Sequence, residues 1–533
     1  MKLRVNYILG FLVTTALMFA LGPKMINPYD EGIITVGAMR VAAGEWPASH
    51  FYSNYGIAQF FLLSSVFKMF GWTMTVGRIY NAVIASFVVM AAMWTLSGLS
   101  WQVGRGKASE AFLAASGLTI LSVLLITFQP LYVTVPVAAL WIVGCRVVVE
   151  ALAAKTAMAF VPVALVVAAS TLFRLENGVL AFGAFGTAIL IVTAMEVREG
   201  ALDLRSAGQR VGGALVLGLG GLLATFAFLH ALGVLAPGVD YTLEYNTTNY
   251  SSMRGLKFPG IADLMRNPLD GFLYAPPAVI VLALVTWFVK ERAGKLLSIP
   301  QRRVLVVSIV TTAVACSQMW VRPDLAHALL PLILATILYF TLLLVFLHGH
   351  QEKGLRPVLL HGVLALSVLV GVASAHDAIT RRGPPVIAAG PSGTVGENGA
   401  GWFYEILPET PEAIRFVTSV TGPDDRILSA TGRHDKVFIN DVAFYFLARR
   451  LPGTRWHHYD PGVQTSEKVQ LEMIDELKNN HVNLIVRVDA WDQVVEPNKS
   501  AESSGVHLLD DFIAQNYQVA WQQGSTTIVM RQP

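Results

Sequence analysis

Long apolar runs, separated by short polar segments, recur from the N-terminus to about residue 375. A helix needs about 17 to 25 apolar residues to cross a bilayer, and most of these runs reach that length. A further run at 56–70 is shorter and contains Lys68. The pattern predicts an α-helical polytopic membrane protein with about eleven spans. They centre on 5–22, 78–99, 111–128, 132–150, 157–173, 178–195, 211–233, 272–289, 303–320, 328–348 and 357–375.

The composition agrees with this interpretation. Hydrophobic residues make up 54% of the 533 residues and charged residues 14%, whereas soluble domains carry about 25% charged residues. The net charge of +3 is too small to indicate a nucleic-acid partner. Cys145 and Cys316 both lie in apolar runs and offer neither a disulfide framework nor a metal-binding spacing, so we expect them to pack as small hydrophobic residues.

The distribution of Lys and Arg predicts the topology. The first run follows Lys2 and Arg4 but lacks a signal-peptide cleavage site, so we interpret it as a retained helix that enters from the cytoplasm. If 56–70 lies in the membrane interface, with Lys68 reaching the headgroups, the basic loops all face the cytoplasm. These loops hold Arg105 and Lys107, Lys155, Arg198 to Arg210, Lys290 to Arg303, and Lys353 and Arg356.

The character of the chain changes near residue 376. Residues 377–411 are rich in Gly and Pro and predict a linker between a membrane domain, 1–376, and a C-terminal domain, 412–533. The C-terminal domain alternates expected strands with helices, which predicts a small α/β fold on the extracytoplasmic side. Strands are expected at "RILSAT", "KVFIN", "VNLIVRVD" and "TTIVMRQ", and helices at "DVAFYFLARRL" and "SEKVQLEMIDELKNN".

With this topology, polar residues gather on the external side. Asp30 and Glu31 follow the first span, and the loop that contains them runs from 23 to 77. Ionisable residues at the ends of apolar spans are costly and are commonly functional. The candidates for substrate or phosphate contacts are Arg174, Glu176, Arg322, Asp324, His327, Tyr52, Asn54, Tyr55, Arg254 and Lys257.

Structural roles remain open for several of these residues. Arg174 and Arg322 could anchor the topology or pair with Glu176 and Asp324, and the aromatic residues could form a belt at the membrane surface. Asp30 could cap a helix that begins beside it and ends near Gly44.

A carboxylate pair at the lipid boundary suits one class of chemistry. A carboxylate can act as a general base toward a hydroxyl, and Arg and His can hold a phosphate. Together they favour transfer of a sugar from a lipid phosphate to an acceptor hydroxyl, with the cations stabilising the departing phosphate.

The stretch "YDEGIITVGAMRVAAGEWPASHFYSNYGIAQFFLLSSVFKMFGWTMTVGRIYNAV" resembles the first external loop of the GT-C glycosyltransferases. The likeness is strongest to the protein O-mannosyltransferase and aminoarabinose-transferase branch, and its motif covers about the first eighty residues. The matching positions are Asp30-Glu31, Gly44, Phe51 to Tyr55, Phe70-Gly71 and Arg78.

The resemblance implies a GT-C fold and an inverting enzyme that takes its sugar from a polyprenyl-phosphate donor. It implies that Asp30 activates the acceptor, with Glu31 as a catalytic partner, and that two interfacial helices lie in the first external loop. The acceptor would be a glycan, lipid or protein outside the cytoplasm. The implied location is the bacterial inner membrane, with membrane lipids around the spans, the N-terminus in the cytoplasm and the C-terminal domain outside.

The chain also departs from the pattern of the family. Asn54-Tyr55-Gly56 replaces a Lys-Pro pair found in aminoarabinose-branch relatives, and "FQPLYVTVP" lacks an acidic residue that many relatives carry after the third span. These differences leave the sugar and the phosphate contacts open. The family includes metal-dependent and metal-independent members; because the first loop has no Asp-x-Asp, we expect no required metal, although a divalent ion is possible.

Other functional classes fit the pattern less well. A transporter or flippase predicts charges near the bilayer midplane and repeated halves, whereas here the charges stand at span ends and no repeat is evident. A receptor or scaffold would not need eleven spans. An O-antigen polymerase or ligase is not expected to open with an acidic pair.

The topology can be tested by cysteine accessibility. Cysteines introduced at positions 60 and 65 are expected to react with a membrane-impermeant reagent from the external side, because 56–70 is placed in the outer interface. Labelling from the cytoplasmic side at either flank of 56–70 would contradict the topology.

Overall fold

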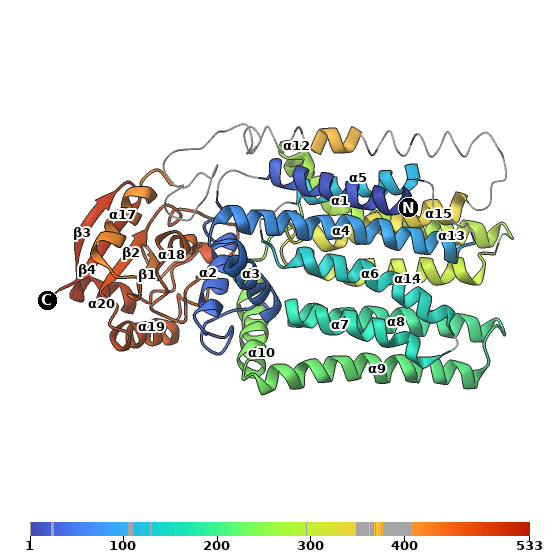
Figure 1. The fold of residues 1–533 in the computed structure, drawn as a ribbon, viewed down its shortest axis with the longest axis horizontal. Helices are drawn as coiled ribbons and strands as arrows, with labels where there is room; N and C mark the ends of the chain where they lie inside the picture. The colour runs from blue at the N-terminus through green and yellow to red at the C-terminus, as the bar shows by residue number, and fades with distance from the viewer. Residues whose placement is uncertain are drawn as a thin grey trace.

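The computed structural model describes residues 2–22, 26–104, 110–127, 131–154, 156–294, 296–347 and 407–532, with isolated residues between 362 and 376. Two parts meet end to end: a long bundle of helices and a smaller C-terminal α/β domain (Figure 1). The predicted linker up to residue 406, most of the predicted span 357–375, and the basic residues Arg105, Lys107, Lys155, Lys353 and Arg356 lie outside the described residues.

The bundle consists of roughly parallel and antiparallel helices along the long axis of the molecule (Figure 1). Its helices are α1 (Lys2–Ala20), α4 (Met74–Gln102), α5 (Glu110–Ile126), α6 (Thr134–Ala153), α7 (Val161–Phe173), α8 (Leu175–Arg198), α9 (Leu204–Ala231), α13 (Ala275–Arg292), α14 (Ile299–Ala315) and α15 (Leu329–Leu347).

Each of the first ten predicted spans falls on one of these helices. Six helical segments of the described residues are long and apolar enough to cross a membrane by themselves, and α1, α5, α7 and α15 contain shorter apolar helices. This arrangement identifies a multi-pass membrane protein. The number of helices that cross stays a prediction.

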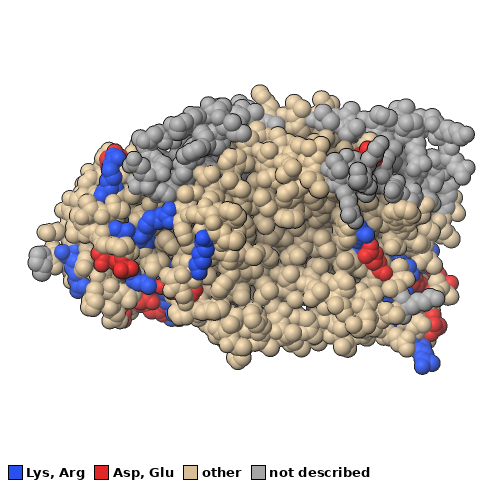
Figure 2. Space-filling model, in the orientation of Figure 1, with Lys and Arg blue, Asp and Glu red and all other residues tan. Residues whose placement is uncertain are grey.

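Charged side chains on the face shown in Figure 2 gather toward the two ends of the molecule, with a largely uncharged surface between them. At the end far from the C-terminal domain, Glu196 accepts hydrogen bonds from Arg210 at 2.8 Å and Arg303 at 2.6 Å. These pairs join α9 and α14 to the end of α8. Which end faces the cytoplasm stays a prediction.

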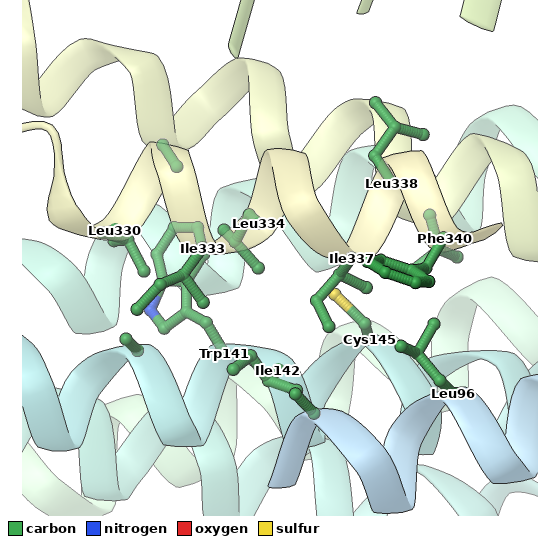
Figure 3. Packing of buried hydrophobic residues seen from close by; sticks show 14 of the residues in the cluster. Leu96, Trp141, Ile142, Cys145, Leu330, Ile333, Leu334, Ile337, Leu338 and Phe340 are labelled. Atoms are coloured by element: carbon green, nitrogen blue, oxygen red, sulfur yellow. The ribbon is translucent and has the colours of Figure 1, made fainter. Parts of the chain in front are cut away.

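The bundle is held by close packing of large apolar side chains. Figure 3 shows Trp141 and Cys145 of α6 packed against Ile333 and Ile337 of α15. Trp141 is fully buried, and both cysteines are free and buried, as predicted. Because shape complementarity drives helix association within a membrane, this contact fixes α6 against α15.

Three helices lie across the end of the bundle that faces the C-terminal domain: α2 (Asp30–Ala42), α3 (Ile57–Phe70) and α10 (Leu235–Glu244) (Figure 1). Helices α2 and α3 match the two predicted interfacial helices, and α2 is followed by Gly44 with φ +91°, as expected of a C-terminal glycine. Phe60 is completely buried, so a cysteine there is shielded; Ser65 is exposed and is the position to label.

The C-terminal domain contains a four-stranded sheet in the order β1-β2-β4-β3. Strands β1 and β2 are parallel, and the other two pairs are antiparallel. The parallel connection passes through two helices, as such a crossover requires. The elements are α17 (Thr410–Val420), β1 (Leu428–Thr431), α18 (Ala443–Ala448), α19 (Glu467–Asn479), β2 (Leu484–Val488), α20 (Leu508–Asn516), β3 (Tyr517–Gln523) and β4 (Thr526–Arg531).

One predicted strand of this domain was wrong. The segment "KVFIN", 436–440, forms no strand, whereas β3, α17 and α20 were not predicted. The alternating apolar residues serve another purpose, because Phe438 and Ile439 line a cavity at the domain boundary and Val437 enters the core. The carbonyl of Phe438 accepts a hydrogen bond from Arg254 instead of from a neighbouring strand.

Helix α2 is fixed on two sides. Toward the bundle, Glu31 forms a buried ion pair with Arg78 of α4, in which one guanidinium N–H donates at 2.7 Å. Toward the C-terminal domain, Gly32 lies so close to α18 that a Cβ atom would come within 2.5 Å of the Ala443 nitrogen. The two contacts make α2 the element that joins both parts of the molecule.

We predict that Glu31→Gln destabilises the protein strongly, because it leaves the buried Arg78 charge without its carboxylate. Removing one partner of a buried ion pair costs about 3–5 kcal/mol. The melting temperature in detergent is expected to fall well below that of the wild type. Glu412→Gln is the control, because it breaks an exposed pair with Arg415 whose contribution is about 0–1 kcal/mol. Equal melting temperatures for the two variants would contradict the prediction.

Candidate functional site

A cavity of about 450 Å³ lies where the end of the bundle meets the C-terminal domain. Its size is within the usual range of about 300–1,000 Å³ for ligand sites. Polar side chains from distant parts of the chain line it. They include Asn27, Tyr29, Asp30, Asn54, Tyr55, Tyr132, Arg174, Glu176, Tyr245, Tyr250, Arg254, Arg322, Asp324, His327, His458 and Asp460.

Asp30 lies at the start of α2 and is held by its neighbour Asn27. The Asn27 amide donates to the Asp30 carboxylate at 2.9 Å, and the Asn27 side-chain oxygen accepts from the backbone N–H groups of Tyr29 and Asp30. Asn27 therefore stabilises the helix start, whereas the N-cap residue Tyr29 makes no side-chain capping hydrogen bond. The carboxylate is left to face the cavity.

The surroundings of Asp30 favour a basic carboxylate. Burial raises its pKa, and the carboxylate of Asp460 acts in the same direction. The Asn27 hydrogen bond and the nearby Arg254 and His327 oppose this effect without cancelling it. A carboxylate with a raised pKa is a stronger proton acceptor when ionised.

Glu31 occupies a different environment from its neighbour. It is fully buried in the ion pair with Arg78, accepts the backbone N–H of Asn27 at 3.0 Å, and does not line the cavity. Successive residues of a helix point about 100° apart, so the two carboxylates leave the helix in different directions, and only Asp30 lines the cavity. The structure thus places Glu31 in the support of α2, outside the cavity lining, and the catalytic partnership expected from the sequence stays a prediction.

A second wall comes from the turn between α7 and α8. Arg174 forms an ion pair with Glu176 at 2.5 Å, and its guanidinium lies 5.8 Å from the ring centroid of Tyr55. The Arg174 Nε, one Glu176 oxygen and the Asn54 side-chain oxygen are buried without hydrogen-bond partners among the described residues. Such groups are costly to leave unsatisfied, so this wall is prepared for a polar ligand.

A third wall is an ordered chain of hydrogen bonds. His327 Nδ1 and Asp324 are 2.7 Å apart, and the Tyr250 hydroxyl lies 2.6 Å from His327 Nε2. When Nδ1 carries the imidazole proton and donates a hydrogen bond to Asp324, Nε2 accepts a hydrogen bond from the Tyr250 hydroxyl. Arg322 donates to Asp324 and, through two nitrogens, to Glu496 of the C-terminal domain. Arg322 is therefore largely committed to protein partners.

The fourth wall belongs partly to the C-terminal domain, and the sequence did not reveal it. Arg254 of the expected set is buried here, 3.6 Å from Asp460. Asp460 also accepts hydrogen bonds from Tyr29 at 2.9 Å and Tyr245 at 3.0 Å. Tyr245 begins a π-helix, η2 (Tyr245–Tyr250), a feature frequent at functional sites, but no sequence pattern identifies it.

Two candidates lie outside the cavity lining. Tyr52 is buried behind it and donates to Asp460 at 3.3 Å. Lys257 is exposed to solvent and does not line the cavity.

The described part of the chain has one cluster with the spacing of metal ligands, formed by Asp435, His507 and Asp510 of the C-terminal domain. It lies apart from the cavity lining. Arg433 pairs with Asp435, and Arg487 with Asp510, so arginines already compensate both carboxylates. Their positive charges make this cluster a poor cation site.

Asp324 yields a prediction for the pH dependence of stability. Burial opposes ionisation, but the His327 hydrogen bonds outweigh it and lower the pKa of Asp324 to about 2. An unfolded aspartate titrates near pH 3.9, so the native contacts of the ionised Asp324 with His327 and Arg322 stabilise the protein above that pH, and this stabilisation is lost as the pH falls toward 2. We expect Asp324→Asn to melt below the wild type at pH 6, with a gap that narrows below pH 4. Asp263→Asn, an exposed control, should show no such gap. A gap unchanged down to pH 3 would contradict the assignment.

Comparisons with known proteins bear on the fold. No family model matches the chain, and no curated protein gives a match. Among solved structures, it is similar to ArnT from Cupriavidus metallidurans bound to undecaprenyl phosphate, with TM-score 0.58, 14% identity, and coverage of 99% of this chain and 98% of that one. The apo state of the same protein gives a TM-score of 0.57 and 12% identity, with coverage of 99% of this chain and 97% of that one.

A third similar structure is the arabinofuranosyltransferase AftD from Mycobacteria, with TM-score 0.50 and 15% identity, over 99% of this chain and 41% of that one. The likeness extends over 99% of the chain and so includes both the bundle and the C-terminal domain. It confirms the fold predicted from the first external loop: the chain has the GT-C fold.

Proposed function

We propose that this protein is an inverting membrane glycosyltransferase. It moves a sugar from a polyprenyl-phosphate donor to a hydroxyl of an extracytoplasmic glycan, lipid or protein. The observation that carries the proposal is the position of Asp30, whose carboxylate shares one cavity with Arg174 and Arg254 at the end of a membrane bundle. A base for the acceptor and cations for the leaving group are the two parts that this reaction requires.

The geometry suits a single displacement. Asp30 accepts the proton of the acceptor hydroxyl while the acceptor oxygen forms a bond to the anomeric carbon of the sugar. The bond from that carbon to the phosphate oxygen breaks, and the lipid phosphate leaves with the electron pair. Attack opposite the leaving group inverts the anomeric centre. No covalent intermediate is needed, so one catalytic carboxylate suffices.

The departing phosphate is best served by Arg174 and Arg254. Arg174 has an Nε without a partner in the described part of the chain. Arg254 donates one N–H to the Phe438 carbonyl and lies 3.6 Å from its carboxylate partner, so both arginines can turn an N–H group toward a ligand. Arg322 is less suited, because Glu496 and Asp324 occupy its donors. Asn54 and Glu176, which also have unpartnered buried oxygens, are placed to accept hydrogen bonds from sugar hydroxyls.

A lipid-linked donor also fits the surface of the bundle. A hollow of about 640 Å³ with an apolar lining runs along α1, α4 and α6 and includes Phe173, the residue next to Arg174. An apolar chain in this hollow would have its phosphate end near the cavity. The similarity to ArnT, which is described as bound to undecaprenyl phosphate, supports the same class of donor.

The location proposed is the bacterial inner membrane, with the N-terminus in the cytoplasm and the cavity outside. This orientation places the pairs of Glu196 with Arg210 and Arg303 on the cytoplasmic side, in agreement with the preference of Arg for that side. A transporter is the alternative. It would need a polar path through the membrane, whereas the described polar cavity lies at one end of the bundle.

We predict that Asp30→Asn reduces glycosyl transfer by at least about 10²-fold, the lower limit expected for loss of a general base. The assay uses purified protein in proteoliposomes with a panel of radiolabelled polyprenyl-phosphate sugars and cell-envelope acceptors. Asp240→Asn is the matched control, because Asp240 is exposed on α10 and lies outside the cavity. Both variants should insert and melt like the wild type.

Near-normal turnover by Asp30→Asn would remove Asp30 from the mechanism. If the wild type transfers none of the sugars but moves a labelled lipid or solute across the liposome membrane, the transporter hypothesis replaces this one.

A further inference from the structure

One carboxylate of the C-terminal domain is held by groups from three separate segments of the membrane domain. Asp460 accepts hydrogen bonds from the hydroxyls of Tyr29, Tyr52 and Tyr245, at 2.9, 3.3 and 3.0 Å. The guanidinium of Arg254 is 3.6 Å away. The Asp460 side chain is 8% exposed, so this convergence takes place in a largely buried setting where hydrogen bonds and charges act strongly.

The backbone around Asp460 is also fixed. Its N–H donates to the Gln464 side chain at 2.7 Å, and the Gln464 amide donates to the carbonyl of His458 at 3.0 Å. Just before this turn, the N–H of Tyr52 donates to the Arg455 carbonyl at 3.0 Å. The first external loop and the loop that carries Asp460 are therefore joined by both backbone and side-chain contacts.

The electrostatic partner of Asp460 is Arg254. Besides the three tyrosines, His458 is a titratable group beside it, with 3.9 Å between His458 Nε2 and an Asp460 oxygen. Burial lowers the pKa of His458 to about 4, so this imidazole is neutral near pH 7. The tyrosines are neutral as well, because burial raises their pKa values. One negative and one positive charge thus stand beside the acidic start of α2.

We propose that the C-terminal domain completes the active site through Asp460, a positioning residue that holds Arg254 and Tyr29 next to Asp30 and adds a negative charge beside that base. This inference rests on the proposed function, because the cavity is an active site only if the protein is an enzyme. The effect of the Asp460 charge on Asp30 does not depend on enzyme activity. The inference assigns to the C-terminal domain a part in the reaction, in addition to any role in binding the acceptor.

The groups that face Asp30 determine what a change at Asp460 does. The charged and polar ones are Asn27 on the same segment, Arg254 after η2, His327 before α15 and Asp460. Tyr55 and Tyr132 also face it from the cavity wall, and burial raises the pKa of both, so they are neutral. Removing the charge of Asp460 removes a like charge and frees Arg254 to approach Asp30. Both effects lower the pKa of Asp30. A single like charge across a protein site commonly shifts a pKa by about half a unit or more.

Carbodiimide labelling measures this shift without any turnover. Dicyclohexylcarbodiimide reacts with protonated carboxyl groups, and mass spectrometry of the peptide with Asp30 gives the pH midpoint of labelling. In the full-length protein, Asp460→Asn is expected to move that midpoint to lower pH by about half a unit or more. Asp460→Glu, which keeps the charge, is expected to stay closer to the wild type.

The matched control is Arg426→Gln. Arg426 joins the C-terminal domain to Glu45 at 2.7 Å, across the same boundary but outside the cavity lining. If Asp460 acted only in docking, Arg426→Gln and Asp460→Asn would affect the labelling midpoint alike. We expect an unchanged midpoint in the control.

The outcomes separate this inference from the proposed function. An unchanged midpoint in folded Asp460→Asn, or a failure to fold of both Asp460→Asn and Asp460→Ser, would overturn the positioning role and leave docking alone. If sugar transfer is found, the acid limb of kcat/KM should move with the labelling midpoint. If the wild type shows no transfer but the midpoint still moves, the proposed enzyme activity fails while the coupling between Asp460 and Asp30 stands.

Discussion

The buried ion pair between Glu31 and Arg78 is the interaction on which the arrangement of the site depends. It ties the first turn of α2 to α4, a bundle helix, in a place where neither charge reaches solvent. Such a pair contributes little net stability compared with apolar packing, but it tolerates very little displacement. Because Asp30 precedes Glu31 on the same helix, fixing one carboxylate toward the bundle directs the other toward the cavity.

The second constraint comes from the opposite side of α2. Gly32 allows the backbone of α18 to approach more closely than any side chain would permit, and the N–H of Ala443 donates to the carbonyl of Pro28 at 2.8 Å. Apolar residues of α2, α3 and the C-terminal domain form one continuous hydrophobic cluster. The C-terminal domain is therefore packed onto α2 and α3 as part of one core, and the cavity wall that it supplies is as firmly placed as the others.

The cavity combines charges of both signs in a way that leaves only some of them available. Arg322 is held by Glu496 and Asp324, so it serves to position the hydrogen-bonded chain through His327 to Tyr250. Arg174 keeps an unpartnered nitrogen. Counting the arginines that line the cavity would not reveal this difference between Arg322 and Arg174. It follows from how many donors the protein itself has already satisfied, and it decides which cations can turn toward a phosphate.

The sequence by itself determined the membrane bundle, because apolar runs of spanning length leave the backbone no alternative to helices in lipid. From charge parity it also predicted an interfacial position for 56–70, and it marked Asp30. Only the tertiary structure separated Asp30 from Glu31, since adjacent helical residues point in different directions. It alone brought Asp460 to Tyr29, a contact 431 residues apart along the chain. A single polar residue in a loop follows no periodic pattern, and "KVFIN" has the alternation of a strand although two of its residues, Phe438 and Ile439, line a cavity. Periodicity reports which face of an element is buried, whereas the meeting of distant loops is decided by packing between domains.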